Sequence, residues 1–237
     1  MGKHKNFLIV LWFLLFSNVL TGMSADTTSI IDNIYNYDFL KAKEQLSRFN
    51  DQNVLMSATL NLEISWWMAI ESGEEKSFAG FLSSLEQFEK SEKSDLREII
   101  SSTYRMRYYA CNNKNYLVPF VFIKIQNKID NVDITKLGDN SKEGLELFIL
   151  YKSFLSLIEN SIIVDRLVSE SKVRRELIGN IEAIIESGSS PNRTIGRYFM
   201  MKYYLDVEKD KSKAFSYLTE LHNQYPKNKI FTQLLTN

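Results

Sequence analysis

The chain has 237 residues, of which 44% are hydrophobic and 24% are charged, so its composition is that of a globular protein rather than a disordered one. Basic and acidic side chains are equal in number, 29 of each, which gives no electrostatic reason to expect nucleic acid or an anionic membrane surface as the partner. Only 3 prolines and 9 glycines are present, which favours an all-α fold over a sandwich with many tight turns.

The N-terminal segment has the three-part layout of a secretory signal peptide. Lys3 and Lys5 precede an uninterrupted apolar run at 7–16, and small residues follow up to Ala25. The run is too short for an ordinary membrane span. The sequence therefore predicts a signal peptide at 1–25 and a mature domain at 26–237 that is exported by the secretory route. An uncleaved anchor that tethers an assembly factor to the membrane is the alternative.

Apolar residues at helical spacing run through the first half of the mature chain. They predict helices that cover 30–35, 38–49, 55–69, 78–88 and 96–104. Asp38 is expected to cap the second of these helices, Ser72-Gly73 to end the third, and Ser94 or Asp95 to cap the fifth.

The second half begins with the most ambiguous segment, 116–123. Its β-branched and aromatic residues favour a strand, but Pro119 suits a first helical turn and the apolar spacing continues to Ile129, so a helix is expected. Further helices are predicted around 145–158, 171–187 and 198–205, from Asp210 to Pro226, and as a short final helix around 231–235.

Three of these helices share one spacing of a cap, a small residue and an apolar stripe. The small residues are Ala42, Gly144 and Ala214, each four positions after Asp38, Asn140 or Asp210. The gaps between the small residues are 102 and 70 residues, close to three and two periods of about 34. This period predicts antiparallel helical hairpins stacked as a short α-solenoid. An ordinary helical bundle whose caps align by chance is the alternative.

The last hairpin resembles a tetratricopeptide repeat. Ala214 and Pro226 match that family's small crossing residue and closing proline, whereas Lys202 and Leu221 replace two of its small residues. Residues 35–42 also resemble the start of tetratricopeptide-like proteins that Gram-negative bacteria export. The resemblance covers roughly 29–49 and 193–228. It implies degenerate TPR-like repeats, protein binding, and a periplasmic or extracellular location in a bacterium.

Aromatic residues form adjacent pairs along the predicted helices. Neighbours on a helix point about 100° apart, so both members of a pair cannot face one narrow buried stripe, and one of them can face a groove. The resemblance places Phe199 and Tyr203 on the concave face that binds partners in the TPR family. The candidate partner-binding residues are Trp66, Trp67, Tyr108, Phe199 and Tyr203. Packing against the next helix is the alternative for each of them.

Few residue types suited to catalysis are present. The mature chain has one histidine, His222, and one cysteine, Cys111, so a His-rich metal site cannot form within it and no internal disulfide is possible. Cys111 is interpreted as a packed small hydrophobe. No phosphate-binding loop or dinucleotide fingerprint occurs. Acid pairs such as Glu143 and Glu146 leave one enzymatic alternative, a carboxylate-dependent hydrolase acting on glycan or peptidoglycan.

Together these observations predict an exported, non-enzymatic scaffold or adaptor that binds a protein or a peptide. We expect no cofactor, no metal and no nucleic-acid partner, and we expect membrane contact only if the N-terminal segment is retained. An aromatic groove suits an extended or helical peptide as the partner.

Overall fold

The computed structural model describes residues 27–49, 54–91, 93–133, 135, 137, 141–162 and 169–236. Within these ranges the regular structure is helical and contains no strand, which confirms the all-α prediction. The predicted signal peptide at 1–25 and the predicted cap Asn140 lie outside the described residues. No helix in the described ranges is both long enough and apolar enough to cross a membrane.

Residues 27–35 are helical and begin the described part of the chain. The elements that follow are α2 (Phe39–Arg48), α3 (Val54–Ser72), α4 (Glu75–Lys90), α5 (Asp95–Cys111), a 3₁₀ turn η1 (Asn115–Leu117), α6 (Val118–Asp130), α7 (Lys142–Ile162), α8 (Ser169–Ser187), α9 (Ser190–Lys202), a π-helical turn η3 (Tyr203–Val207), α10 (Lys211–Gln224) and α11 (Lys229–Thr236).

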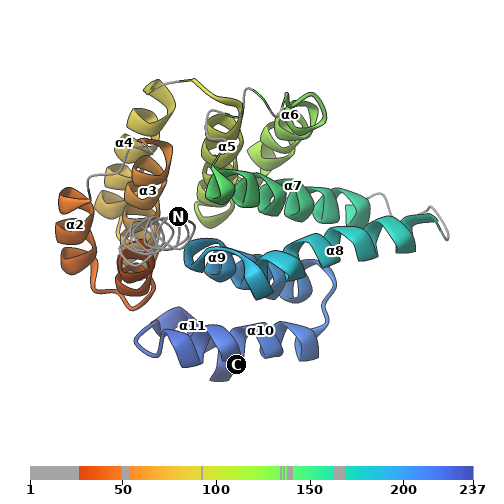
Figure 1. Ribbon diagram of the computed structural model, residues 1–237. Coiled ribbons are helices and arrows are strands. Elements are labelled where there is room, and N and C mark those ends of the chain that lie inside the picture. Colours follow the sequence, from red (N-terminus) through yellow and green to blue (C-terminus); the bar gives the residue numbers. More distant parts are fainter. Residues whose placement is uncertain are drawn as a thin grey trace, which may run out of the picture.

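Consecutive helices pack as pairs: α3 with α4, α5 with α6, α7 with α8, and α9 with α10 (Figure 1). The first helices of the later pairs also touch one another, because α7 contacts both α5 and α9. This arrangement is compatible with a helical-repeat fold.

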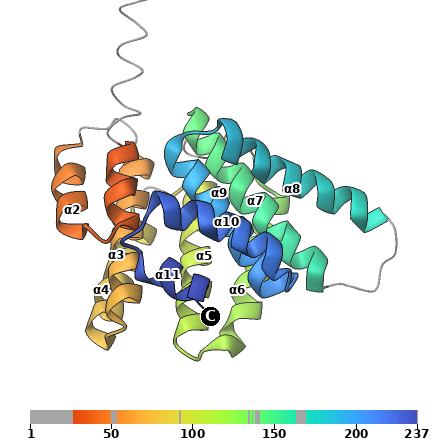
Figure 2. The same ribbon diagram turned by 90° about the horizontal axis from the view of Figure 1, so that it is seen from below.

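The first and last parts of the described chain pack against each other (Figure 2). Tyr37 donates its hydroxyl hydrogen bond to Asn228 Oδ1 at 3.1 Å, and Asn228 Nδ2 donates to the carbonyl oxygen of Tyr35 at 3.0 Å. The Tyr35 ring lies 5.1 Å from that of Tyr225, measured between centroids. The helix at 27–35 is thereby held against the segment between α10 and α11, and the contact joins residues more than 190 positions apart in the sequence.

Helix α3 is buried on more than one side, which explains how two adjacent tryptophans both enter the core. Trp66 meets Phe81 of α4 and Tyr104 of α5, with centroid distances of 5.1 and 6.0 Å. Trp67 faces another direction and meets Tyr35 at 4.9 Å. The expectation that one member of each aromatic pair faces a groove is therefore wrong for this pair, because different neighbouring helices cover the two directions.

The ambiguous segment around Pro119 is helical, as expected. It begins with η1 and continues as α6, and Pro119 lies in the first turn, where its missing N–H costs no hydrogen bond. Helix α3 ends at Ser72, and Gly73 follows with a φ of 65°, the left-handed conformation that favours glycine.

The predicted caps have different outcomes. Asp210 caps α10 by accepting a hydrogen bond from the Lys213 amide at 3.1 Å, and Ser94 caps α5 in the same way. Asp38 flanks α2 but makes no side-chain cap, because its carboxylate instead lies 3.0 Å from Lys227 Nζ. At α7 the capping side chain is Ser141, whose hydroxyl accepts from the Gly144 amide at 3.0 Å.

Candidate functional site

The five aromatic residues singled out from the sequence do not form one surface. Trp66, Trp67, Phe199 and Tyr203 are all buried, with at most 4% of each residue exposed. Tyr108 is half-buried and packs against Phe78 and Phe81. Direct partner contact by the four buried side chains remains a prediction, and it would require the surrounding helices to separate.

Phe199 and Tyr203 are integrated into the packing around α9. The Phe199 ring stacks on Phe154 of α7 with centroids 4.3 Å apart, and the Tyr203 hydroxyl donates to Glu208 Oε1 at 2.6 Å. Replacing either side chain would therefore remove core contacts, so a loss of binding in such a variant would be accompanied by a loss of stability.

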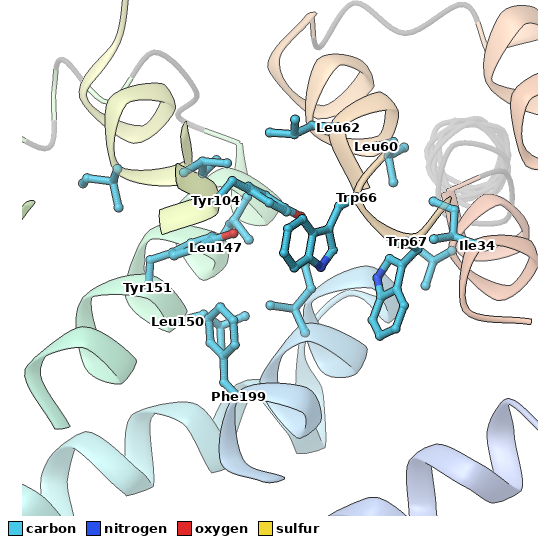
Figure 3. Packing of buried hydrophobic residues seen from close by; sticks show 14 of the residues in the cluster. Ile34, Leu60, Leu62, Trp66, Trp67, Tyr104, Leu147, Leu150, Tyr151 and Phe199 are labelled. Atoms are coloured by element: carbon cyan, nitrogen blue, oxygen red, sulfur yellow. The ribbon is translucent and has the colours of Figure 1, made fainter. Parts of the chain in front are cut away.

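One of the predicted residues, Trp67, belongs to a buried group of polar side chains that sequence analysis missed, and Trp66 lies next to this group. We call this group the polar centre and define it by its members from α3, α5 and α7: Glu63, Trp67, Tyr104, Arg107 and Tyr151. Trp66 borders the polar centre, and the hydroxyl ends of Tyr104 and Tyr151 point toward the Trp66 ring (Figure 3). The polar centre therefore joins α3, α5 and α7, the first helices of three successive helix pairs.

Arg107 supplies the positive charge of the polar centre. Its guanidinium carbon lies 4.5 Å from the Trp66 ring centroid, 4.9 Å from that of Tyr104 and 5.3 Å from that of Tyr198. Burial by itself lowers the pKa of the Arg107 guanidinium. The surrounding acidic groups, of which Tyr198 has the largest effect, outweigh burial and raise this pKa overall, so Arg107 stays a cation. The side chain is only half-buried, so a water-sized molecule can reach part of it.

Glu63 supplies the negative group, and only 4% of the residue is exposed. Burial raises the pKa of its carboxyl, and the opposing effects of Arg107 and of the Tyr104 and Trp67 side chains do not cancel that rise. The Tyr104 hydroxyl and the Trp67 indole N–H act as hydrogen-bond donors toward the Glu63 carboxyl, although their geometry is poorer than that of an ordinary hydrogen bond. The three buried side chains therefore serve as one another's polar partners.

The tyrosines near Glu63 stay neutral and keep their hydroxyl protons. Burial, followed by the charge of Glu63, raises the pKa values of Tyr104 and Tyr151 above the ordinary tyrosine range. The polar centre therefore contains several hydrogen-bond donors, a lasting positive charge and one carboxylate acceptor. In the described ranges, no three His, Cys, Asp or Glu side chains come together in a way that could hold a metal ion.

The sequence carries a weak signal for the polar centre. Glu63 interrupts an apolar stretch between Leu62 and Ile64, which are both buried. A charged residue inside such a stretch is a reason to look for a buried partner, but the sequence does not show which residue approaches it.

The hydrolase alternative needs two carboxylates that act on one bond. Glu146 is the other largely buried glutamate in the described ranges, and it has a different environment from Glu63. Its Oε2 accepts hydrogen bonds from the Ser189 amide at 2.9 Å and from Asn192 Nδ2 at 3.1 Å, so it anchors the start of α9. No described carboxylate forms a catalytic pair with Glu63, so the structure gives the hydrolase alternative no support.

A second candidate site lies on the outer face of α6. Phe120 and Ile123 are 71% and 59% exposed and, three residues apart, lie on one face of α6. Tyr116, which is 69% exposed, lies in η1 directly before this helix. The charged side chains Lys124 and Lys128 instead pair with acids of α5. We call these three residues the α6 stripe. Helix α6 packs on α5 and α7 (Figure 1), whereas the three side chains of the stripe are largely exposed.

Cys111 differs from its interpretation as a packed hydrophobe. It ends α5, and its residue surface is exposed. Partial burial of the thiol still raises its pKa, the state expected of an unreactive thiol.

Comparison with known proteins gives no match: no family model, no curated protein and no solved structure is significantly similar to this chain.

Proposed function

We propose that this chain is a non-enzymatic scaffold built of TPR-like helical hairpins, that it is exported to the periplasm or the extracellular space, and that it binds another protein. The observation that carries the proposal is the α6 stripe. Exposed large apolar side chains occur singly elsewhere in the described ranges, as at Leu40 and Val173. In contrast, Phe120 and Ile123 share one face of α6, and Tyr116 lies in η1 directly before it. Grouped exposed apolar residues mark interaction sites more often than scattered ones do.

The occupant that fits the α6 stripe best is an amphipathic helix of a partner protein. The stripe covers about two helical turns, the length over which one helix presents apolar residues to another. The lysines of α6 next to it, Lys124 and Lys128, are already paired with Glu98 and Asp95, so these two charges do not select an acidic partner.

The test introduces a charge into the α6 stripe by the substitution Phe120→Asp. We expect loss of partner binding, because a carboxylate would have to be desolvated against an apolar helix face. Stability should change by less than about 0.5 kcal/mol, since Phe120 is largely exposed. Binding is measured by affinity capture from the exported fraction, followed by titration of the identified partner in purified form.

The matched control is Leu40→Asp, which places the same charge at an exposed but isolated apolar residue of α2. It should leave partner binding unchanged. Equal binding by wild type and Phe120→Asp would contradict the proposal. So would a wild-type dimer in analytical ultracentrifugation that Phe120→Asp dissociates, because the occupant would then be a second copy of the chain.

The export part of the proposal depends on residues 1–25 and is tested separately. N-terminal sequencing of the protein recovered from its final compartment should start near Asp26. A chain that keeps its first residues would support the tethered assembly factor instead.

A further inference from the structure

The final described segment, 227–236, is short and buries little of its own surface. We call it the C-terminal strap; it consists of Lys227, Asn228 and α11. Helix α11 has 8 residues, which is too short for a helix to be stable on its own in water, and Phe231 is its one fully buried side chain. The helix lies at the lower edge of the molecule in Figure 1. Its position therefore depends on a small set of contacts.

An aromatic anchor and several polar contacts hold the strap in place. The Phe231 ring lies 6.0 Å from the Trp67 ring and 6.3 Å from the Tyr35 ring, measured between centroids. Asn228 donates to the Tyr35 carbonyl oxygen and accepts from the Tyr37 hydroxyl. Two ion pairs are added by lysine side chains that are 65% and 70% exposed, so both pairs are weak and are screened by salt.

The chain directly before the strap is anchored separately. Tyr225 is completely buried, and its hydroxyl oxygen lies 2.6 Å from Thr194 Oγ1 of α9, which fixes the end of α10 to the core. Pro226 and Lys227 follow and are exposed. A hinge at these two residues releases Asn228 and α11 while Tyr225 stays in place. Segments with few buried apolar contacts open locally at a lower free energy than the whole protein unfolds.

The aromatic residues that Phe231 covers have further contacts outside the strap. Trp67 of α3 meets Tyr198 of α9, with ring centroids 5.8 Å apart. The Tyr35 ring lies 4.9 Å from that of Trp67 and 5.1 Å from that of Tyr225. Opening of the strap therefore uncovers aromatic rings that other contacts still hold. Such a surface suits the apolar face of a helix.

We propose that the C-terminal strap is a displaceable intramolecular ligand, and that an amphipathic helix of a partner protein replaces it on the surface formed by Tyr35 and Trp67. The contacts of α11 define which helix fits. Phe231 packs on the two rings, and Lys229 pairs with Glu71 of α3 at 2.5 Å. The partner helix therefore carries a basic residue, a large aromatic residue two positions later and apolar residues one turn further on. This surface is distinct from the α6 stripe and does not depend on what binds there.

The test offers the strap to the full chain as a separate labelled peptide with the sequence of residues 227–237, and fluorescence anisotropy measures binding. In the wild type the intramolecular strap competes, so binding is weak. Asn228→Ala removes the hydrogen bonds that hold the strap, and the peptide supplies its own asparagine for them. We expect the peptide to bind this variant at least about tenfold more tightly, because apparent affinity rises with the fraction of open molecules.

Two controls show whether the peptide binds beneath the strap. A peptide that carries Phe231→Ala lacks the aromatic anchor and should bind at least about tenfold more weakly. The chain variant Phe120→Asp changes only the α6 stripe and should leave peptide binding unchanged. Hydrogen exchange of the wild type needs no variant and stays decisive if Asn228→Ala fails to fold. The amides of residues 232–236 should exchange faster than those of Leu218 and Leu221 in α10.

Four results would overturn the proposal. The first is equally slow amide exchange in α11 and α10, which would make the strap a fixed part of the core. The second is equal affinity of the peptide for wild type and a folded Asn228→Ala. The third is equal binding of the two peptides. The fourth is a wild-type dimer in which two copies exchange α11, because the occupant would then be a second copy of the chain.

Discussion

Single buried polar residues distinguish this protein most clearly from a simple helical bundle. Glu63 is the main example, because burial of its carboxyl makes the ionised form costly, and Arg107, Tyr104 and Trp67 offset that cost only in part.

The variant Glu63→Gln should be more stable than the wild type at neutral pH. Burial raises the folded-state pKa of Glu63 above the ordinary value of 4.5. The contribution of Glu63 to stability is therefore complete at pH values below 4.5, and it is lost as the pH rises through the folded-state pKa. Arg107, Tyr104, Trp67, Tyr35 and Tyr151 surround the carboxyl, and Arg107 is the only cation among them. Glutamine resembles the protonated acid at every pH.

We expect a gain of about 1–3 kcal/mol in the free energy of unfolding at pH 7, and almost none at pH values below 4.5. Urea unfolding at both pH values, with wild type and variant compared at each, measures the difference. A loss of stability at neutral pH would mean that the ionised carboxylate has a favourable partner in the folded state.

At the scale of elements, the helices follow from local sequence signals. The segment around Pro119 forms a helix because the proline occupies its first turn, and Asp210 and Ser94 cap their helices as predicted. The prediction fails where a distant element competes for a side chain. Asp38 is such a case, since Lys227 attracts the carboxylate that would otherwise cap α2.

The crossing of α9 over α8 and α7 depends on the absence of a side chain at Gly196. A Cβ atom at this position would lie 2.9 Å from Ile185 Cγ1 and 3.3 Å from Leu150 Cδ2. We therefore expect Gly196→Ala to destabilise the protein, because the steric cost of about 1–3 kcal/mol exceeds the gain in helix propensity of about 1 kcal/mol.

The control for this prediction is Gly179→Ala in the middle of α8. A Cβ there meets nothing within 4 Å, so only the gain in helix propensity remains, and stability should rise by up to about 1 kcal/mol. Thermal and urea unfolding of both variants give the comparison. Stabilisation by Gly196→Ala would show that α8 and α9 can move apart without cost.

At the scale of the whole molecule, contact between the two ends of the described chain is the feature that a linear array of hairpins does not require. Asn228 is completely buried and makes the central contact. Besides its bonds with Tyr35 and Tyr37, its Oδ1 accepts from the Phe231 amide at 3.2 Å, which caps α11. One side chain thus joins the first described helix to the last.

The substitution Asn228→Ala should destabilise the protein by about 1–3 kcal/mol, because it leaves the Tyr35 carbonyl and the Phe231 amide without their partner. The emission of Trp67, which packs against Phe231, should shift to longer wavelength if α11 separates from α3. The exposed Asn127→Ala serves as the control and should change neither quantity. An unchanged unfolding midpoint in Asn228→Ala would contradict a structural role for the contact between the ends.

The amino-acid sequence by itself determines the all-α class, most helix positions and several caps of this protein, because periodicity, turn residues and capping side chains act within a few residues of the chain. Only the tertiary structure decides that Trp66 and Trp67 are both buried, that Phe199 belongs to the core, and that Glu63 lies near Arg107. These outcomes depend on which helices cover each face of α3, α5 and α9. The contacts involved join distant parts of the chain, and local spacing contains no information about them.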